Sequence, residues 1–480
     1  MSLSIFTAAR QAPHAEGLVC DGARLTFSAL AGRVEARRAQ FEALGVRALD
    51  PRPVALIVDG SVAMFEYLYL CFELGVPVLP LHPRLTAHER QSLIEASSAQ
   101  STIDPSQHER GRPPRAQHWD WPRIPDTHAL ALVPSSGSTG RPKLVELSRR
   151  AFCALARADA ERVPPRVDDR ALLCLPLSHV GGLSVVTRSL AARRCCVAFR
   201  SGGGGLLGSI AELAQSLEEE RISLLSLVPP VLARLLREAP ELAARAPLRA
   251  ILVGGQACSA ELFAAARACA LPVLTSYGLT ETCSQVSTLA FPPPDTAPSK
   301  GGVIGVGFPL PGVEVRVVNG LIEVRGPTLF SGYLDGAATL DDDGFFHTDD
   351  RGAFDPELGL FVFGRASDVI ITGGENVDPI EVEHALLACD GVEAASVFGI
   401  PDSEFGEQVA AALEISHGTA FDERALFAAL SQRLAAFKQP RALCLFDTLP
   451  RLGSGKLDRR QIRERAVLRL RPADRAKRPA

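Results

Sequence analysis

The sequence predicts a large α/β region built on parallel sheets, followed by a small α+β domain at the C-terminal end. Through the first 280 residues, short apolar runs alternate with helical stretches, which is typical of parallel sheets covered on both faces. From about residue 303 the pattern changes to strict alternation of apolar and polar residues, which is typical of antiparallel strands. The length of 480 residues suits about two to four units of roughly 150 residues each.

Buried strands are predicted at the apolar runs of the first region, each placed between helical stretches. One helix is predicted over 61–75 and ends at Gly75, since glycine favours the left-handed conformation that closes a helix. The proline-rich stretch 103–125 is predicted to cross the surface as a connection. The predicted strands are 53–59, 76–81, 129–136, 171–178, 222–230, 248–255 and 271–278.

A β-rich subdomain is predicted at about 300–364. Its clearest element is VEVRVVNGLIEVRG, in which two alternating runs flank Asn319-Gly320, a strong signal for a two-residue hairpin turn. We therefore divide the chain into an N-terminal domain over 1–366, which includes this subdomain, and a C-terminal domain over 367–480.

Composition and charge exclude several classes of protein. Apolar residues make up 46% and charged residues 22%, as in an ordinary globular protein. A net charge of -4 argues against a nucleic-acid-binding protein, which needs a basic face. No apolar run reaches the length of a membrane-spanning helix, and no secretory signal pattern opens the chain. The 11 cysteines lack metal-ligand spacing and indicate buried thiols in a reducing cytoplasm.

The segment SSGSTGRPK, residues 135–143, carries the strongest chemical signal. Its glycines allow tight turns, and its small hydroxyl residues leave backbone N–H groups free to cradle a polyphosphate. It differs from a Walker A loop, because Pro142 precedes Lys143 and Leu144 follows it. A Gly/Ser-rich segment equally suits a flexible loop, but this one follows a buried strand and ends in one of only five lysines. The predicted phosphate-binding residues are Ser136, Gly137, Ser138, Thr139, Gly140 and Lys143.

This loop resembles the phosphate loop of the acyl-adenylate-forming enzymes, the AMP-binding superfamily of acyl-CoA ligases, peptide-synthetase adenylation domains and luciferases. Other motifs similar to those of the superfamily follow in the same order, and the resemblance spans the chain from residue 25 to about 465. Each motif alone is a weak signal, whereas the ordered set is specific. The motifs are Gly254–Gln256, Ser276–Thr282, Thr348–Asp350, Gly364–Asp368, Gly373–Asn376 and Gly453–Lys456.

The resemblance implies that the protein uses ATP and CoA as co-substrates and Mg²⁺ as cofactor. It places the adenine against the ring of Tyr277 and beside the backbone of Gly255 and Gly278. Asp350 is expected to accept hydrogen bonds from the ribose hydroxyls, and Arg365 is expected to reach the ribose or the phosphates. Outside these motifs, Tyr277 suits a core aromatic residue and Arg365 suits a surface ion pair.

The same resemblance implies the catalytic groups. Thr280 offers its hydroxyl to the α-phosphate, and Glu281 is the expected Mg²⁺ ligand, since Mg²⁺ prefers hard oxygen ligands. Lys456, in the glycine-flanked loop LGSGKLD, is expected to stabilise the charge that gathers when a carboxylate attacks the α-phosphate. An isolated lysine is more often a solvated surface residue, and the role of Lys438 in AAFKQP stays open.

The C-terminal domain is expected to be mobile and to turn about Ser367, so that Gly374, Glu375 and Asn376 serve the reaction with CoA. Two residues depart from the superfamily pattern. Ser367 stands where Asp or Lys is common, and Asp349 stands where glycine is usual. Aspartate suits an unusual turn at that position, because it tolerates a positive φ angle better than most residues.

His179 follows the predicted strand 171–178, and the carboxyl end of a strand in an α/β sheet faces the usual ligand crevice. The resemblance places this histidine between the acyl pocket and the phosphates. A buried histidine with satisfied hydrogen bonds fits the same pattern. No other histidine has a comparable context.

Two stretches, 177–188 and 280–285, are similar to the 2-succinylbenzoate–CoA ligases of menaquinone biosynthesis, one branch of the superfamily. That substrate has a second carboxylate, which needs a partner when it is buried. On a helix predicted from about Gly182, Ser184 and Arg188 share a face, and an arginine matches a carboxylate in bidentate fashion. Arg188 equally suits a surface arginine or the partner of a structural acid.

The sequence therefore predicts a cytoplasmic acid–CoA ligase that joins 2-succinylbenzoate to CoA and converts ATP to AMP and pyrophosphate. The alternatives are another acyl- or aryl-CoA ligase and a stand-alone adenylation enzyme. The lack of Gly-Lys-Ser/Thr argues against a P-loop NTPase. The presence of Glu281 and Lys456 argues against an inactive nucleotide-binding protein. The sequence is compatible with a homodimer and does not fix the oligomeric state.

Overall fold

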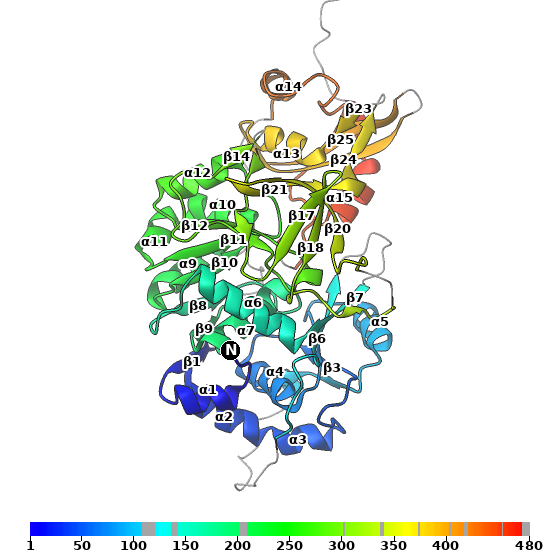
Figure 1. The fold of residues 1–480 in the computed structure, drawn as a ribbon. Coiled ribbons are helices and arrows are strands. Elements are labelled where there is room, and N and C mark those ends of the chain that lie inside the picture. The colour runs from blue at the N-terminus through cyan, green and yellow to red at the C-terminus, as the bar shows by residue number, and fades with distance from the viewer. Residues whose placement is uncertain are drawn as a thin grey trace, which may run out of the picture.

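The computed structural model of the chain contains two large sheets, a smaller antiparallel sheet and a C-terminal α+β body (Figure 1). The predicted α/β class is confirmed, and the small C-terminal body lies at the top of Figure 1. The structure describes residues 1–107, 121–135, 143–200, 209–300, 303–336, 340–372, 375–402, 405–416, 421–453 and 455–472.

The first large sheet has six strands in the order β19-β7-β6-β4-β3-β5. Strands β3 to β6 run parallel, and β7 pairs antiparallel with β6. Every residue of β3 and β4 is buried, because helices or other chain segments cover both faces of the sheet. The strands are β3 Val54–Ile57, β4 Val78–Leu81, β5 Ser101–Ile103, β6 Ala129–Ser135, β7 Lys143–Ser148 and β19 Gly332–Tyr333.

The second large sheet has nine strands in the order β16-β13-β12-β11-β10-β8-β9-β1-β2, and its central strands are parallel. Two predicted strands were too long. The strand predicted over 171–178 ends at Leu173, before the turn at Pro176, and the one predicted over 222–230 ends at Leu227, because Pro229 begins a helix. The strands are β1 Glu16–Cys20, β2 Ala23–Thr26, β8 Arg170–Leu173, β9 Cys195–Ala198, β10 Leu224–Leu227, β11 Ala250–Val253, β12 Val273–Tyr277, β13 Ser287–Thr288 and β16 Phe308–Pro309.

Helices α6 and α7 lie between the two large sheets, where α6 contacts β7 and α7 contacts β8 and β9 (Figure 1). Helix α4 ends at Gly75 with φ of 64°, as predicted. Helix α7 begins at Val180 rather than near Gly182, because the chain turns at Pro176 and His179 occupies the N-cap position. The helices of the N-terminal region are α1 Ile5–Gln11, α2 Phe27–Ala36, α3 Arg38–Ala43, α4 Val62–Leu74, α5 Ala87–Ser97, α6 Arg149–Arg162, α7 Val180–Ala192, α9 Ile210–Glu219, α10 Pro229–Glu238, α11 Pro240–Arg245 and α12 Ala260–Ala268, with the 3-10 turns η1 Pro105–Gln107 and η2 Thr280–Thr282.

The antiparallel sheet has the order β17-β18-β20-β21 and contains the predicted hairpin. Asn319 and Gly320 form its turn with φ angles of 52° and 79°, which the Asn-Gly pair tolerates. In β20, Asp349 has a φ of 61°, in agreement with the turn angle expected there. The strands are β17 Glu314–Val318, β18 Leu321–Arg325, β20 Phe346–Asp355 and β21 Gly359–Arg365, beside the two-stranded sheet of β14 Ser299–Lys300 and β15 Val303–Ile304.

The C-terminal body has its own apolar core on each face of one sheet. Alternate residues of the central strand β25 point to opposite faces, so one set packs against α13 and α14 and the other against α15. The elements are η3 Ala366–Asp368, β22 Ile370–Thr372, β23 Glu375–Val377, α13 Pro379–Leu387, β24 Val392–Asp402, β25 Gly406–Ile415, α14 Glu423–Ser431, β26 Ala442–Phe446, α15 Arg459–Val467 and β27 Arg471–Pro472.

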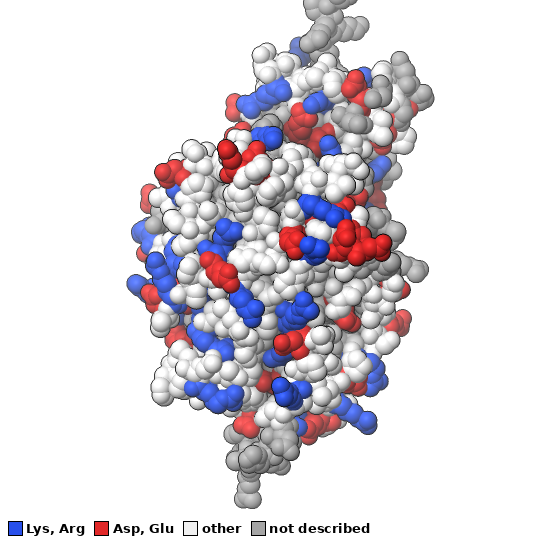
Figure 2. All heavy atoms as spheres, in the orientation of Figure 1, with Lys and Arg blue, Asp and Glu red and all other residues white. Residues whose placement is uncertain are grey.

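The surface carries both signs of charge. In the view of Figure 2, basic and acidic side chains are interspersed, and no continuous basic surface covers this face of the molecule. This distribution agrees with the small net charge. None of the helices in the described part of the chain is both long and apolar enough to cross a membrane.

Candidate active site

A cavity of about 3040 Å³ is lined both by the N-terminal region and by the C-terminal body. Residues that follow the carboxyl ends of β8, β11 and β12 form one wall, which is where ligands bind in open α/β sheets. The predicted site residues that line this cavity are Lys143, His179, Ser184, Arg188, Gly255, Tyr277, Gly278, Thr280, Glu281, Asp350, Arg365 and Lys456.

The structure does not bring every predicted residue to this cavity. Glu375 and Asn376 belong to β23, and Ser367 lies in η3. Glu375 is not among the described residues that line the cavity, and the side chains of Asn376 and Ser367 lie outside the described part of the structure. The predicted residues Ser136, Gly137, Ser138, Thr139, Gly140 and Gly374 lie outside the described part of the chain.

Tyr277 at the end of β12, Asp350 within β20 and Arg365 at the end of β21 form a connected group. The Tyr277 hydroxyl donates to Asp350 Oδ2 at 2.6 Å, and Arg365 Nε lies 3.5 Å from Asp350 Oδ1. Burial raises the pKa of Tyr277 well above its ordinary value, and Asp350 adds to the shift. Burial also raises the pKa of Asp350, against the opposing effects of the tyrosine hydrogen bond and Arg365. The tyrosine therefore stays protonated and fixes the orientation of the carboxylate.

Glu281 is held by a tyrosine from another part of the chain. Tyr333, in β19, donates its hydroxyl to Glu281 Oε1 at 2.9 Å, and Lys143 Nζ lies 4.7 Å from the centre of the Tyr333 ring. Glu281 is only 9% exposed. None of the described residues donates to its second oxygen, Oε2. A buried carboxylate with one oxygen fixed and one uncommitted suits a hard cation such as Mg²⁺.

Two glycines allow close approaches of the chain in the wall of the cavity. A Cβ at Gly278 would lie 1.4 Å from the carbonyl oxygen of Ser284, so the turn after β12 admits no side chain there. Gly255 follows β11 with φ of 78°, and a Cβ there would lie 2.6 Å from Lys456 Nζ. The absence of a side chain at Gly255 therefore allows the ammonium group of Lys456 to approach the backbone of the N-terminal region.

Lys456 enters the cavity on a turn of the C-terminal body. The N–H of Leu452 donates to the Lys456 carbonyl at 2.7 Å, and Arg451 pairs with Leu457 as an antiparallel bridge. Burial lowers the pKa of Lys456, and the charge of Arg365 lowers it further. None of the described residues accepts a hydrogen bond from its ammonium group. The lysine is a half-buried donor with its hydrogens uncommitted, which suits the binding of an anion.

His179 is half-buried and lines the same cavity as the lysine. Burial lowers its pKa to about 4, and electrostatic repulsion from Lys456 and from the protonated form of His82 contributes to the shift. At neutral pH the imidazole is therefore uncharged and does not repel Lys456. It can still take part in hydrogen bonds or pack against an apolar acyl group.

Arg188 faces the cavity from α7 but already has an acidic partner. Its Nη1 donates to Asp159 Oδ1 at 2.7 Å, Nη2 to Ser226 Oγ at 3.3 Å and Nε to the Ser184 carbonyl at 3.2 Å. The Ser184 hydroxyl donates to the Gly181 carbonyl at 2.7 Å. The alternative that Arg188 is the partner of a structural acid is therefore correct as far as Asp159 is concerned. The three bonds use three of the five N–H groups of the guanidinium, which leaves two for a ligand.

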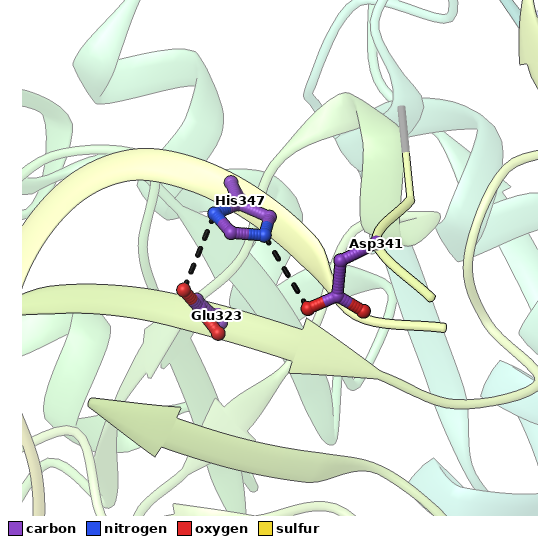
Figure 3. Close-up of side chains that lie close together, drawn as sticks. All are labelled: Glu323, Asp341 and His347. Atoms are coloured by element: carbon purple, nitrogen blue, oxygen red, sulfur yellow. Dashed lines mark ion pairs between the residues drawn. The ribbon is translucent and has the colours of Figure 1, made fainter. Parts of the chain in front are cut away.

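A different cluster of possible metal ligands contains Glu323, Asp341 and His347 (Figure 3). His347 Nδ1 lies 3.2 Å from Glu323 Oε1, and Nε2 lies 3.4 Å from Asp341 Oδ2. Arg316 pairs with both carboxylates, at 2.5 and 2.6 Å. A cation would have to displace this guanidinium, so the cluster is an ion-pair network rather than a metal site.

Sequence reasoning missed three residues at the site: Tyr333, Ser226 and Asp159. Tyr333 is one of only four tyrosines and follows Gly332 in SGY, which was a weak signal that went unused. Ser226 is a polar residue within the apolar strand β10. No local signal joins Asp159 of α6 to Arg188 of α7, because only the packing of the two helices brings them together.

Comparison with known proteins is in agreement with this geometry. The family model described as AMP-binding enzyme matches residues 5–334, and the model described as AMP-binding enzyme C-terminal domain matches residues 381–456. The chain is 31% identical to 2-succinylbenzoate–CoA ligase from Bacillus pumilus, over 95% of this chain and 96% of that protein.

Solved structures show the same likeness. The o-succinylbenzoate CoA synthetase from Bacillus subtilis in complex with the acyl-adenylate intermediate OSB-AMP has a TM-score of 0.83 and 29% identity, over 95% of this chain and 97% of that one. The same enzyme in complex with ATP and magnesium ion has a TM-score of 0.82 and 29% identity, over 96% and 98%. The predicted superfamily is thus confirmed: the chain belongs to the AMP-binding enzyme family and is an acid–CoA ligase.

Proposed function

We propose that this enzyme activates 2-succinylbenzoate and transfers it to CoA, with ATP converted to AMP and pyrophosphate and with Mg²⁺ as cofactor. Two relatives with that activity in their names support the substrate, and one of them was solved with ATP and magnesium ion. The observation that carries the chemistry is the meeting of Lys456, Glu281 and Asp350 in one cavity.

In the first step, a carboxylate oxygen attacks the α-phosphorus of ATP and pyrophosphate leaves. Tyr277 and Asp350 would orient the nucleoside, and Thr280 would hold an oxygen of the α-phosphate. Negative charge gathers on the phosphoryl oxygens as the attack proceeds. The uncommitted ammonium group of Lys456 would stabilise that charge without first breaking a hydrogen bond.

In the second step, the thiolate of CoA attacks the acyl carbon and AMP leaves. We propose that the C-terminal body, residues 367–480, turns about Ser367 relative to residues 1–366 before this step. Glu375 and Asn376 would act after the turn, and Glu375 is not among the described residues that line the cavity in the present arrangement, which supports this role. A hinge of this kind is a standard mechanism of domain movement.

Glu281 would hold Mg²⁺ through its uncommitted oxygen, while Tyr333 keeps the carboxylate in place. The ion would neutralise part of the phosphate charge when bound. Lys143, against the Tyr333 ring, would contact the outer phosphates.

The second carboxylate of the substrate would bind at Arg188. Two guanidinium N–H groups remain beyond the bonds to Asp159, Ser226 and Ser184, and the residue lines the cavity beyond His179. Asp159 would keep the guanidinium in position and offset part of its charge. This arrangement suits an aromatic acid with one additional carboxylate.

The function is tested with a panel of free acids that includes 2-succinylbenzoate and monocarboxylate analogues, each with ATP, Mg²⁺ and CoA. We expect AMP, pyrophosphate and the thioester, with 2-succinylbenzoate preferred. Thioester formation with another acid alone would favour a different acyl- or aryl-CoA ligase. AMP without thioester would favour a stand-alone adenylation enzyme, and ADP with phosphate would contradict the reaction type.

The Arg188→Lys variant tests the substrate assignment. Loss of the bidentate partner should weaken binding of 2-succinylbenzoate by roughly 2–5 kcal/mol, while a monocarboxylate analogue should be unaffected. The measurement is kcat/KM for both acids. Equal losses for the two acids, or no loss, would remove Arg188 from the substrate site.

A further inference from the structure

The turn that carries Lys456 rests on a histidine of the N-terminal region. His82 directly follows β4, in the first large sheet, and a Cβ at Gly453 would lie only 3.0 Å from His82 Nε2. The ring carbons of His82 are nearly as close, at 3.3 and 3.4 Å. The edge of the imidazole is therefore in direct contact with the backbone of the lysine turn.

The ring of His82 is held in a defined orientation. Its Nδ1 accepts a hydrogen bond from the N–H of Arg84 at 3.1 Å, and its carbonyl accepts one from Leu85 at 3.1 Å. With Nδ1 as acceptor, Nε2 carries the hydrogen and faces the turn. Burial and the charge of Arg84 lower the pKa of His82, so the ring is neutral at neutral pH and adds no charge beside Lys456.

The lysine turn thus contacts the N-terminal region at two glycine positions. At Gly453 the turn supplies the glycine and the N-terminal region supplies the His82 ring; at Gly255 the N-terminal region supplies the glycine and the turn supplies Lys456. The base of the turn stays attached to the C-terminal body, where Arg451 pairs with Glu414 at 3.0 Å.

We infer that His82 is a positioning residue for adenylation, which sets the depth to which the Gly453–Lys456 turn enters the cavity and so places the Lys456 ammonium group at the α-phosphate. This inference rests on the proposed function. His82 acts through the lysine and not on the substrate, because it is not among the described residues that line the cavity. When the C-terminal body turns away for the reaction with CoA, the contact is lost and His82 has no further role.

The test measures the two half-reactions separately in the full-length enzyme. Adenylation is followed as pyrophosphate release from ATP and the acid, and thioester formation is followed from synthetic acyl-adenylate and CoA. The His82→Ala and His82→Asn variants should both lose roughly 10- to 100-fold in the rate of adenylation, the order expected for a displacement of about 1 Å, and keep thioester formation. Asparagine can still accept a hydrogen bond from the Arg84 N–H, so this variant keeps the local turn. Its shorter side chain does not fill the space beside Gly453.

A double-mutant cycle tests whether the effect of His82 on adenylation depends on Lys456. In a Lys456→Ala background, His82→Ala should cause no further loss, because its effect passes through the lysine. Gly453→Ala should impair adenylation in the wild-type background and cost nothing more in the His82→Ala background. The matched control is His14→Ala, an exposed histidine between α1 and β1 that is not among the described residues lining the cavity, and this variant should behave as wild type.

Three results would overturn the role of His82: equal loss in both half-reactions, a full additional loss in the Lys456→Ala background, or wild-type adenylation by His82→Asn. Each of these requires that the wild-type enzyme forms AMP. Failure of the wild type to form AMP with any acid would instead overturn the proposed function, together with this inference.

Discussion

The two walls of the cavity are held in different ways. On the wall formed by the N-terminal region, side-chain bonds join Tyr277 to Asp350 and Tyr333 to Glu281, at 2.6 and 2.9 Å. On the opposite wall, Lys456 approaches by contact with Gly255, and its ammonium group has no acceptor among the described residues. The first wall is thus prepared before any ligand arrives, whereas the second gains its bonds only from an anionic ligand.

This difference suits the two half-reactions of the proposed function. The groups proposed to bind the nucleotide throughout the cycle are fixed by hydrogen bonds within the N-terminal region. Lys456, proposed to act in adenylation alone, is carried on the C-terminal body and has no hydrogen-bond partner among the described residues. Substitutions on the C-terminal wall should therefore change the rate of one half-reaction, whereas substitutions on the N-terminal wall should change the binding of Mg²⁺·ATP.

The largest effect is expected at Lys456. Lys456→Ala should lower the rate of adenylation by roughly 10²–10³-fold, since a donor to the transition-state charge is lost. Thioester formation from preformed acyl-adenylate should be retained, because the lysine turn is withdrawn for that step. Separate assays of the two half-reactions check this. Lys300→Ala, which removes an exposed lysine near Asp355, is the control and should leave both steps intact.

Equal loss of both half-reactions in Lys456→Ala would show that the lysine stays in the cavity throughout. The alternation of the C-terminal body would then be wrong, although the reaction itself would stand.

A smaller effect is expected on the prepared wall. Tyr333→Phe removes the hydrogen bond to Glu281, and a bond to a charged group contributes about 1.5–3 kcal/mol. The KM for Mg²⁺·ATP should rise about tenfold or more, with little change in kcat. Tyr67→Phe, which removes a tyrosine bond to Gln40 far from the cavity, is the control. A change in kcat alone would mean that Tyr333 does not position the metal ligand.

His179 should make stability depend on pH. Its pKa is about 4 in the folded protein and near 6.5 when unfolded, so between these values the unfolded chain binds more protons. The free energy of unfolding should therefore fall by roughly 1–2 kcal/mol as the pH drops from 7 to 5, after discounting for partial exposure. His179→Asn should lose this component, as measured by the denaturation midpoint at both pH values. The same slope in variant and wild type would contradict the buried neutral histidine.

The smallest effect is expected at an ion pair between the two bodies. Arg237 Nη1 of α10 lies 3.3 Å from Glu393 Oε1 of β24, and both side chains are partly exposed. Glu393→Gln should slow adenylation about two- to threefold at low salt and less at high salt, as for other exposed pairs. Glu464→Gln, which breaks a pair within α15, should have no effect. A loss that persists at high salt would point to a cause other than this pair.

Much of the prepared wall could be predicted from the sequence, because its residues sit in short motifs beside glycines and strand ends. Tyr277, Glu281 and Asp350 are examples, and all of them line the cavity. Strand ends were less predictable at 171–178 and 222–230, where apolar residues continue into turns that proline imposes.

Contacts between distant segments could not be predicted in the same way. Tyr333 reaches Glu281 because β19 adds to the edge of β7, and Asp159 meets Arg188 because α6 packs on α7. The prediction that no other histidine has a context comparable to that of His179 is wrong, because His82 directly follows the buried strand β4. Its contact with Gly453 could not be predicted, because it depends on the position of the C-terminal body. Local patterns identify which residues carry chemistry, and packing decides which partners they meet.

The most direct test of the central claim follows an oxygen atom from the acid. The enzyme is incubated with ATP, Mg²⁺, CoA and 2-succinylbenzoate labelled with ¹⁸O in its carboxylates, and the products are examined by mass spectrometry. If a carboxylate oxygen attacks the α-phosphorus and the thiol later displaces AMP, one ¹⁸O atom must appear in the phosphate of AMP. Label in inorganic phosphate, with ADP as the nucleotide product, would show attack at the γ-phosphorus and would contradict the account.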